Sequence, residues 1–286
     1  MNFASAQSTG GPPPARRRLI VNADDFGRSP SINQAVIRAH REGILTTASL
    51  MVNEPHAAEA IVLARQNPLL GVGLHLSLAC GVSALPAQEI PDLVDSGGRF
   101  SDNPVAAGCR YFFSRQCRRQ LPLEIAAQFE KFRATGLKLD HINGHLNLHL
   151  HPVIFAILIG NAEKFGIKTL RLTNDPFLLN ARLAGGRWFY RLSHAVIYRI
   201  LSSRARLALA QKGIRHTGAV FGLLQNALVD TAYVAKLLPA LPPGDSELYS
   251  HPSLDQFKNE FDALVRPDIK NLTVQLGLQL IRYQDL

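Results

Sequence analysis

The stretch Leu19-Ile20-Val21-Asn22-Ala23-Asp24-Asp25-Phe26-Gly27 begins with an apolar run and ends with two carboxylates and a glycine. A short apolar run that is closed by polar residues and glycine is typical of a buried strand followed by a loop. The next residues, 29–43, contain a serine cap, a proline suited to the first helical turn, apolar residues at helical spacing and a final glycine. The stretch therefore predicts one strand–helix unit, with Asp24 and Asp25 at the junction.

The same alternation continues along the chain, which has 286 residues. Further strands are expected at residues 48–52, 71–78, 137–142, 168–172, 217–221, 246–249 and 278–283, and further helices at 57–66, 122–135 and 152–165. Residues 80–109 are too rich in proline and glycine to belong to the core. Strands that alternate with helices predict an α/β fold whose parallel strands are joined by right-handed crossovers. Seven or eight such units in a chain of this length favour a barrel over an open sheet.

Length and composition set the domain plan. Residues 1–17 hold a glycine- and proline-rich run followed by arginines, without the apolar stretch of a secretory signal, so we expect a disordered leader there. The barrel domain is then expected over residues 18–286. No run approaches eighteen uninterrupted apolar residues, so no membrane span is expected. The three cysteines show no pairing pattern, which favours a reducing cytoplasm.

The net charge of +9 would suit nucleic acid, an anionic membrane or an acidic substrate. The chain shows no helix-turn-helix, zinc-finger or aromatic RNA-binding signature, so a nucleic-acid partner is not expected. Residues 181–212 intersperse arginines among aromatic and aliphatic residues. A basic amphipathic helix of this kind can make peripheral contact with an anionic membrane or cover an apolar ligand. The simpler interpretation, which we favour slightly, is an outer barrel helix with a solvated basic face.

Residues 140–152 are unusually rich in histidine and hold four of the ten histidines of the chain. Neutral imidazole is the commonest metal ligand in proteins. The cluster therefore makes a metal-dependent site the first hypothesis for the function of this chain, and the next question is which residues complete the site.

Chemistry in a parallel barrel is located at the carboxyl ends of the strands. Asp24 and Asp25 follow the first predicted strand and His75 lies on the third. His145 and His251 follow two later strands. Each residue alone has a plainer explanation, such as a helix cap for the aspartates or a hydrogen-bonded core position for His75. The prediction of a functional site rests on the convergence of these separate regions at one end of one barrel.

A divalent-metal hydrolase needs two or three fixed ligands, an open coordination position and a nearby base. Asp25, His75 and His145 could supply one oxygen and two nitrogens. Asp24 could then reach the attacking water, provided that the two aspartates lie in a loop rather than in an extended strand. His149, four residues beyond His145, is either a fourth ligand or a group that supports a ligand.

Four segments of the chain resemble the YdjC/ChbG-like carbohydrate deacetylases. They are the motif at residues 22–27, the strand segment at 73–76, the His145-x-x-x-His149-x-x-Pro152 segment and the pair His251-Pro252. The resemblance extends from about Arg18 to the C-terminus. It implies a single distorted TIM-like (β/α) barrel with parallel strands that removes the N-acetyl group from an amino sugar.

The resemblance also implies a role for each matching residue. Asp25, His75 and His145 would bind the metal ion. Asp24 would be the base that activates water, and His251 would be the acid that protonates the leaving amine. This assignment agrees with the ligand set suggested by the residues themselves.

This chain departs from the commoner family pattern, in which three consecutive histidines follow an Asp-Ser pair. The variant Asp140-His141-x-Asn143-x-His145 and the basic segment 181–212 are most similar to the hopanoid-biosynthesis-associated branch of the family. That similarity implies a lipid-linked substrate, an N-acetylglucosaminyl hopanoid, and a cytoplasmic location at the inner face of the membrane. His149, Asn143 and Arg171 are further candidates for contacts with the metal ligands or the substrate.

Zinc suits one carboxylate and two imidazoles, although magnesium, manganese, nickel or cobalt would fit the same set. Two other functions use the same features. A phosphoesterase would need a second metal ion and more basic residues at the strand ends, where Arg171 is the evident candidate. A sugar- or lipid-binding protein would need no turnover, but it would have no use for a full set of ligands, base and acid.

Overall fold

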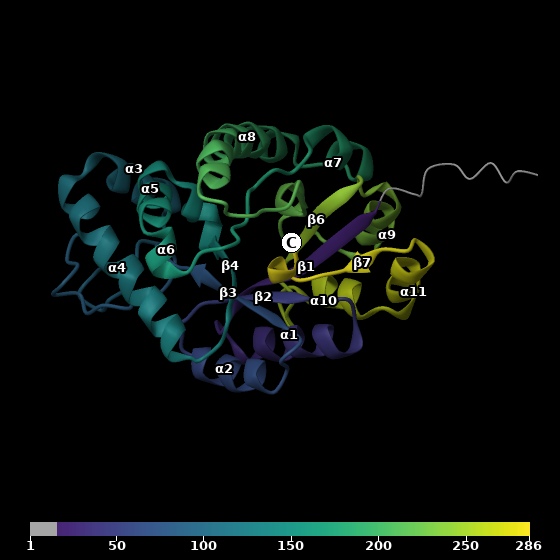
Figure 1. The fold of residues 1–286 in the computed structure, drawn as a ribbon, viewed down its shortest axis with the longest axis horizontal. Coiled ribbons are helices and arrows are strands. Elements are labelled where there is room, and N and C mark those ends of the chain that lie inside the picture. Colours follow the sequence, from purple (N-terminus) through teal and green to yellow (C-terminus); the bar gives the residue numbers. More distant parts are fainter. Residues whose placement is uncertain (1–15) are drawn as a thin grey trace, which may run out of the picture.

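The computed structural model describes residues 16–286, and Figure 1 shows their arrangement around a parallel sheet. The strands of this sheet are β1 (Arg17–Phe26), β2 (Thr47–Leu50), β3 (Gly71–Leu76), β4 (Leu139–Gly144), β5 (Ala219–Phe221), β6 (Gly244–Ser250) and β7 (Gln279–Leu280). Their order is β4-β3-β2-β1-β6-β5, and β7 pairs with the beginning of β1. All these strand pairs are parallel.

The sheet curls because the segment 168–174 connects its two edge strands. Leu170 forms a parallel bridge with Ile142 of β4. At the other edge, the backbone N–H of Val220 in β5 donates to the carbonyl oxygen of Asn174 at 3.0 Å. The fold is therefore a distorted barrel of parallel strands, and the predicted fold class is confirmed. The strand expected at 168–172 is replaced by isolated bridges along an irregular segment.

Helices surround the sheet (Figure 1). They are α1 (Pro30–Glu42), α2 (Ala57–Arg65), α3 (Pro104–Phe113), α4 (Arg115–Ala134), α5 (Pro152–Gly160), α6 (Ala162–Phe165), α7 (Phe177–Leu183), α8 (Trp188–Gln211), α9 (Thr231–Ala240), α10 (Lys258–Val265) and α11 (Pro267–Gln275). Short 3₁₀ helices lie at η1 (His145–Leu150), η2 (Leu223–Gln225) and η3 (Tyr283–Asp285). Within residues 16–286, no helix combines the length and apolar character needed to cross a membrane.

The opening strand–helix unit forms as the sequence indicates. The Ser29 side chain accepts a hydrogen bond from the Ile32 backbone N–H at the start of α1, and the helix ends before Gly43. This cap satisfies one of the donors that a helix leaves free at its N-terminus. The unit thereby fixes the path of the chain directly after the two aspartates.

Several predicted boundaries are wrong. The sequence predicts that the first strand ends before the two aspartates, but β1 continues through both to Phe26, which still pairs with Leu50 of β2. The basic segment 181–212 is interrupted, because α7 ends at Leu183 and α8 begins at Trp188. The sequence did not predict α3, α9, α10 or α11. Residues 1–15 of the expected leader lie outside the described residues, and Arg17 already belongs to β1.

Gly73 of β3 allows a buried histidine to pack against the strand. A Cβ atom at this position would lie 2.5 Å from the ring of His141. That ring stacks on Tyr283 at 4.5 Å between centroids, and its Nε2 lies 2.9 Å from the hydroxyl of Ser49. His141, one of the four clustered histidines, is therefore part of the barrel core.

We expect Gly73→Ala to lower the free energy of unfolding, because the added methyl group must displace the His141 ring. Overpacking of this kind costs about 1–3 kcal/mol. Urea denaturation monitored by circular dichroism would measure the change. Gly160→Ala is the matched control, since the space around Gly160 is open at the end of α5. An equal loss of stability in both variants would contradict the close approach at Gly73.

Candidate metal centre

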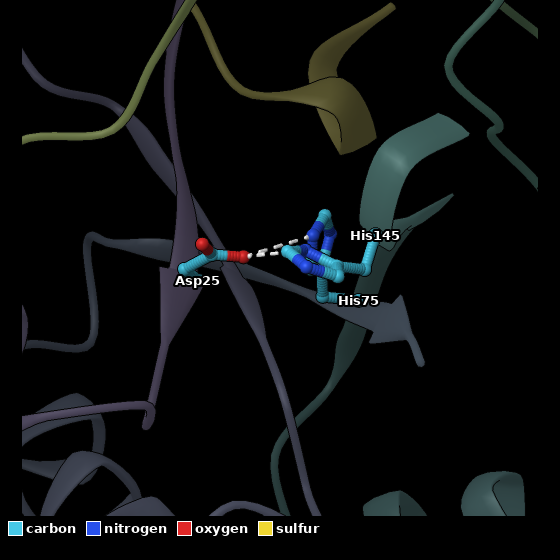
Figure 2. Close-up of side chains that lie close together, drawn as sticks. All are labelled: Asp25, His75 and His145. Carbon is cyan, nitrogen blue, oxygen red and sulfur yellow. Dashed lines mark ion pairs between the residues drawn. The ribbon is translucent and has the colours of Figure 1, made fainter. Parts of the chain in front are cut away.

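Asp25, His75 and His145 meet at the carboxyl ends of β1, β3 and β4 (Figure 2). Their donor atoms lie within 4.8 Å of one another, and all three residues are buried. His75 Nε2 is 3.3 Å from Asp25 Oδ1, and His145 Nδ1 is 3.0 Å from the same oxygen. One carboxylate oxygen and two ring nitrogens thus face a common point, although they come from three distant parts of the chain.

A local break in β1 presents both aspartates to one side. Adjacent side chains of a regular strand point to opposite faces. Asp25 instead has a left-handed backbone, with φ of 63°, and the register of β1 against β2 shifts between Ala23 and Phe26. Asp24 and Asp25 consequently line the same cavity. Aspartate is one of the few residues other than glycine that tolerates this conformation.

The donor set fits a divalent cation. Asp25 Oδ2 accepts a hydrogen bond from Arg28 at 3.0 Å. Asp25 Oδ1 is buried, and within residues 16–286 it has no partner in hydrogen-bonding geometry, although the two imidazoles approach it. A buried carboxylate oxygen without a donor is costly. A cation between the oxygen and the two ring nitrogens would satisfy all three atoms, and one oxygen with two nitrogens is a typical zinc set.

Asn143 fixes the orientation of His75. The Nδ1–H of His75 donates to Asn143 Oδ1 at 2.7 Å, which leaves the Nε2 lone pair directed toward Asp25. The Asn143 amide in turn donates to Asp24 Oδ1 at 2.9 Å and to Ser49 Oγ at 2.8 Å. Histidine ligands of metals generally have such a partner on the second nitrogen. Asn143 therefore links a candidate ligand to the neighbouring carboxylate.

Arg171 holds Asp24 in the ionised form. Its guanidinium is fully buried and donates to both carboxylate oxygens of Asp24, at 2.6 and 3.0 Å. It also donates from Nε to Glu247 at 2.9 Å. Burial raises the pKa of Asp24, but the charges of Arg171 and His75 outweigh burial and place the pKa well below its usual range. Asp24 is therefore a fixed carboxylate beside the donor set.

His251 follows β6 and lines the same cavity as Asp24 and Asp25. Its Nε2 lies 2.8 Å from the hydroxyl of Tyr249, and its Nδ1 lies 3.9 Å from a carboxylate oxygen of Glu260. These two contacts hold the ring at the wall of the cavity.

The cavity has a volume of about 740 Å³, and one of its walls is formed by α8. This wall consists of Tyr190, His194, Ile197, Tyr198 and Leu201. The predicted segment 181–212 thus includes a helix that covers the candidate site with aromatic and aliphatic side chains.

His149 does not join the donor set, so its interpretation as a fourth ligand is wrong. The residue is fully buried, and burial lowers the pKa of its imidazole to about 3. The neutral ring hydrogen bonds through Nε2 to the backbone carbonyl of Arg171 at 2.9 Å. His149 therefore supports the segment that presents Arg171. Of the four clustered histidines, His145 alone contributes to the donor set.

Sequence reasoning missed Arg28, Glu247, Tyr249 and Glu260. A signal for two of them was present: Glu247, Tyr249 and His251 occupy alternate positions along one predicted strand and its end. Strand periodicity places such residues on one face. Arg28 and Glu260 left no comparable pattern.

Fold and site together define an α/β barrel protein with a candidate divalent-metal centre at the carboxyl ends of its strands. Residues 18–275 match the family described as YdjC-like protein, and the chain belongs to this family.

Curated relatives are similar over about half of this chain. A carbohydrate deacetylase from Brevibacillus brevis is 41% identical over 153 residues, which are 52% of this chain and 57% of the relative. A carbohydrate deacetylase from Geobacillus stearothermophilus is 39% identical over 150 residues, again 52% of this chain and 57% of the relative. The chain thus spans little more than half the length of these relatives.

A solved structure supports the fold over almost the whole chain. It is that of a proposed cellobiose-phosphate cleavage protein from Enterococcus faecalis V583, with a TM-score of 0.71 and 24% sequence identity. The match covers 95% of this chain and 99% of the other chain.

We expect Asp25→Asn and His75→Ala to abolish zinc binding, because the first removes the negative charge of the one carboxylate in the set and the second removes one of its two ring nitrogens. Asn143→Ala should weaken zinc affinity by roughly 10–100-fold, the usual effect of losing the hydrogen-bond partner of a histidine ligand. Elemental analysis after dialysis at a fixed free zinc concentration would measure occupancy. His251→Ala is the control that changes a histidine in the same cavity, and loss of zinc in that variant would contradict the assignment of ligands.

We also expect zinc to dissociate when the solution is acidified. Burial lowers the pKa of His75, but the carboxylates of Asp24 and Asp25 outweigh burial and raise it above its ordinary value. A proton therefore competes for Nε2 at a higher pH than it would at an ordinary histidine, whose pKa is about 6.5. Zinc titrations between pH 8 and pH 5.5 should show affinity that falls with pH, and a constant affinity would contradict this competition.

Proposed function

We propose that this protein is a metal-dependent deacetylase that hydrolyses the N-acetyl group of an amino sugar. The supporting observation is one cavity that contains the Asp25, His75 and His145 donor set together with an ionised carboxylate, Asp24, and a histidine, His251. The curated relatives named carbohydrate deacetylases support the choice of substrate.

Amide hydrolysis needs a polarised carbonyl, a deprotonated water and a protonated leaving amine. A divalent cation held by Asp25, His75 and His145 would polarise the carbonyl and make water more acidic; zinc is our first choice, and magnesium, manganese, nickel or cobalt are the alternatives. Asp24 accepts the proton from water. Arg171 keeps Asp24 ionised and in place, so no proton has to leave the carboxylate first. Because the same ion pair makes Asp24 a weaker base, the transfer also relies on the cation to make the water more acidic.

His251 then donates a proton to the nitrogen of the departing amino sugar. A carboxylate oxygen of Glu260 and the hydroxyl of Tyr249 lie beside the two ring nitrogens and hold the ring in place. The base, Asp24, lies on β1, and the acid, His251, follows β6, which is the neighbouring strand of the barrel. This proximity allows both groups to act on one amide in the cavity.

The geometry supports a phosphoesterase less well. Arg171, the basic residue expected to bind phosphate, is buried and already pairs with Asp24 and Glu247. Of the Lys and Arg residues in the described chain, Arg28 alone lines the cavity, and it pairs with Asp25. A second metal ion would need a second set of ligands. Among residues 16–286 one set of candidate metal ligands is found, which is Asp25, His75 and His145.

We further propose that the acetylated sugar is lipid-linked, as an N-acetylglucosaminyl hopanoid. The chain would then belong to the hopanoid-biosynthesis-associated, or HpnK-type, branch of the family. It would act in the cytoplasm at the inner face of the membrane. The apolar wall from α8 supports this substrate, because Ile197, Tyr198 and Leu201 could cover a bulky aglycone. A free sugar would leave much of that wall in contact with water.

We expect the zinc-loaded protein to release free amine from N-acetylglucosamine conjugates and to prefer a lipid-linked conjugate over a soluble oligomer in kcat/KM. Asp24→Asn and His251→Ala should each lower kcat by about 10²–10⁴-fold, since each removes one proton transfer. Fluorescent labelling of the released amine would measure turnover.

Metal content measured on the same samples separates loss of catalysis from loss of zinc. Hydrolysis of phosphate esters without amine release would contradict the proposal and favour the phosphoesterase. Binding of the sugar without any turnover would favour a binding protein.

A further inference from the structure

Helix α8 has two different faces. Toward the cavity it presents Tyr190, His194 and Tyr198, whose successive ring centroids lie 3.9 and 5.7 Å apart. On the other face it exposes five large apolar side chains, which we call the outward stripe: Phe189, Leu192, Val196, Ile200 and Leu207. Spacings of three, four and seven residues place the stripe along one side of the helix.

The exposure of the outward stripe is high, at 89% for Phe189 and 67% for Leu207. Exposed apolar patches of this kind mark surfaces that another molecule covers. Figure 1 shows α8 at the periphery of the molecule, outside the sheet.

Basic residues are concentrated around the stripe. The segment 176–229 contains eight of the 31 Lys and Arg residues of the chain and no Asp or Glu. The 23 Lys and Arg residues outside this segment nearly balance the 22 acidic residues of the chain. The eight are Arg182, Arg187, Arg191, Arg199, Arg204, Arg206, Lys212 and Arg215, of which Arg191 is buried and the other seven are exposed. Almost all of the net charge of +9 therefore belongs to the segment that bears the outward stripe.

We propose that the outward stripe and its neighbouring arginines bind the surface of a membrane that contains anionic lipids. The apolar side chains would enter the boundary between headgroups and acyl chains, and the arginines would contact lipid phosphates. A second copy of this chain is a poorer partner, because it would bring the same positive charge to the contact. Nucleic acid would bind the arginines but leave the apolar stripe exposed.

The entrance to the cavity has a related character. Val105, Leu146 and Ile197 each line the cavity and are each about half exposed or more. Ile197 lies next to Val196 of the outward stripe, so the apolar rim continues the stripe. If the proposed deacetylase function is correct, on which this step rests, a lipid-linked sugar would enter from the bilayer with its lipid against the rim.

Flotation of the zinc-loaded 286-residue chain with vesicles tests the docking surface. The vesicles contain phosphatidylcholine alone or phosphatidylcholine mixed with phosphatidylglycerol. We expect binding to the mixed vesicles, and loss of most of that binding in Phe189→Ser/Leu192→Ser. The matched control is Leu69→Ser/Val274→Ser, which removes two apolar side chains outside α8 that are 73% and 76% exposed, against 89% and 55% for Phe189 and Leu192, and it should bind like the wild type.

The arginines are tested separately. Arg199→Gln/Arg206→Gln should weaken binding to the mixed vesicles by about fivefold for each arginine. Lys236→Gln/Lys270→Gln removes two exposed positive charges from α9 and α11 and should have a much smaller effect. Equal binding to both kinds of vesicle, or equal effects of the two pairs, would overturn the electrostatic part of the proposal.

Two further results would overturn membrane docking as a whole. One is that Phe189→Ser/Leu192→Ser binds the mixed vesicles as well as the wild type does. The other is a wild-type dimer, detected by light scattering, that Phe189→Ser/Leu192→Ser dissociates, because the stripe would then be an interface between copies. Amine release from a soluble N-acetylglucosamine oligomer separates this proposal from the catalytic one. The stripe variant should retain that activity. Absence of amine release by the wild type from both the soluble oligomer and a lipid-linked conjugate would refute the deacetylase function alone.

Discussion

The buried guanidinium of Arg171 is the interaction on which the rest of the site depends. It joins Asp24 of β1 to Glu247 of β6, and none of the three side chains is more than slightly exposed. Two carboxylates in a dry interior need a fixed positive partner, and removal of that partner would leave uncompensated charge. Through Asp24 the constraint reaches Asn143 and then the His75 ring. The ion pairs thus position a candidate base and a candidate ligand at once.

The distorted barrel is what brings Arg171 to that position. The segment 168–174 makes isolated bridges in place of a full strand, and its irregular path lets a long side chain enter the barrel between β1 and β6. His149 supports this path by binding the Arg171 carbonyl. A second irregularity, the left-handed backbone at Asp25, turns adjacent carboxylates toward one cavity. Both departures from regular strand geometry lie at the site, where strain is expected to serve function.

Much of this could be predicted from the sequence, and the failures have physical causes. Strand–helix alternation predicted the parallel barrel, and strand ends predicted which residues would meet. The sequence predicts too short a first strand, because the adjacent aspartates are typical of a loop. In the structure, the pairing of β1 with β2 continues beyond these aspartates to Phe26. His149 was placed beside His145 on the assumption of a regular turn. Left-handed conformations at Leu146 and Asn147 redirect the chain between them. Such conformations at ordinary residues leave no periodic signal in a sequence.

The basic segment shows why composition left two interpretations open. Arginines interspersed with apolar residues are equally compatible with a solvated outer helix and with a helix that covers something apolar. The structure separates the apolar residues into an inner set that lines the cavity and the outward stripe. If the outer face of α8 only contacted water, apolar residues would be needed only on the inner face, where they line the cavity. The interpretation as a solvated basic helix therefore leaves the outward stripe unexplained. A surface that is both apolar and positively charged matches the boundary of an anionic bilayer, where both kinds of side chain find partners. The same helix would then connect the site of the chemistry to the source of its substrate.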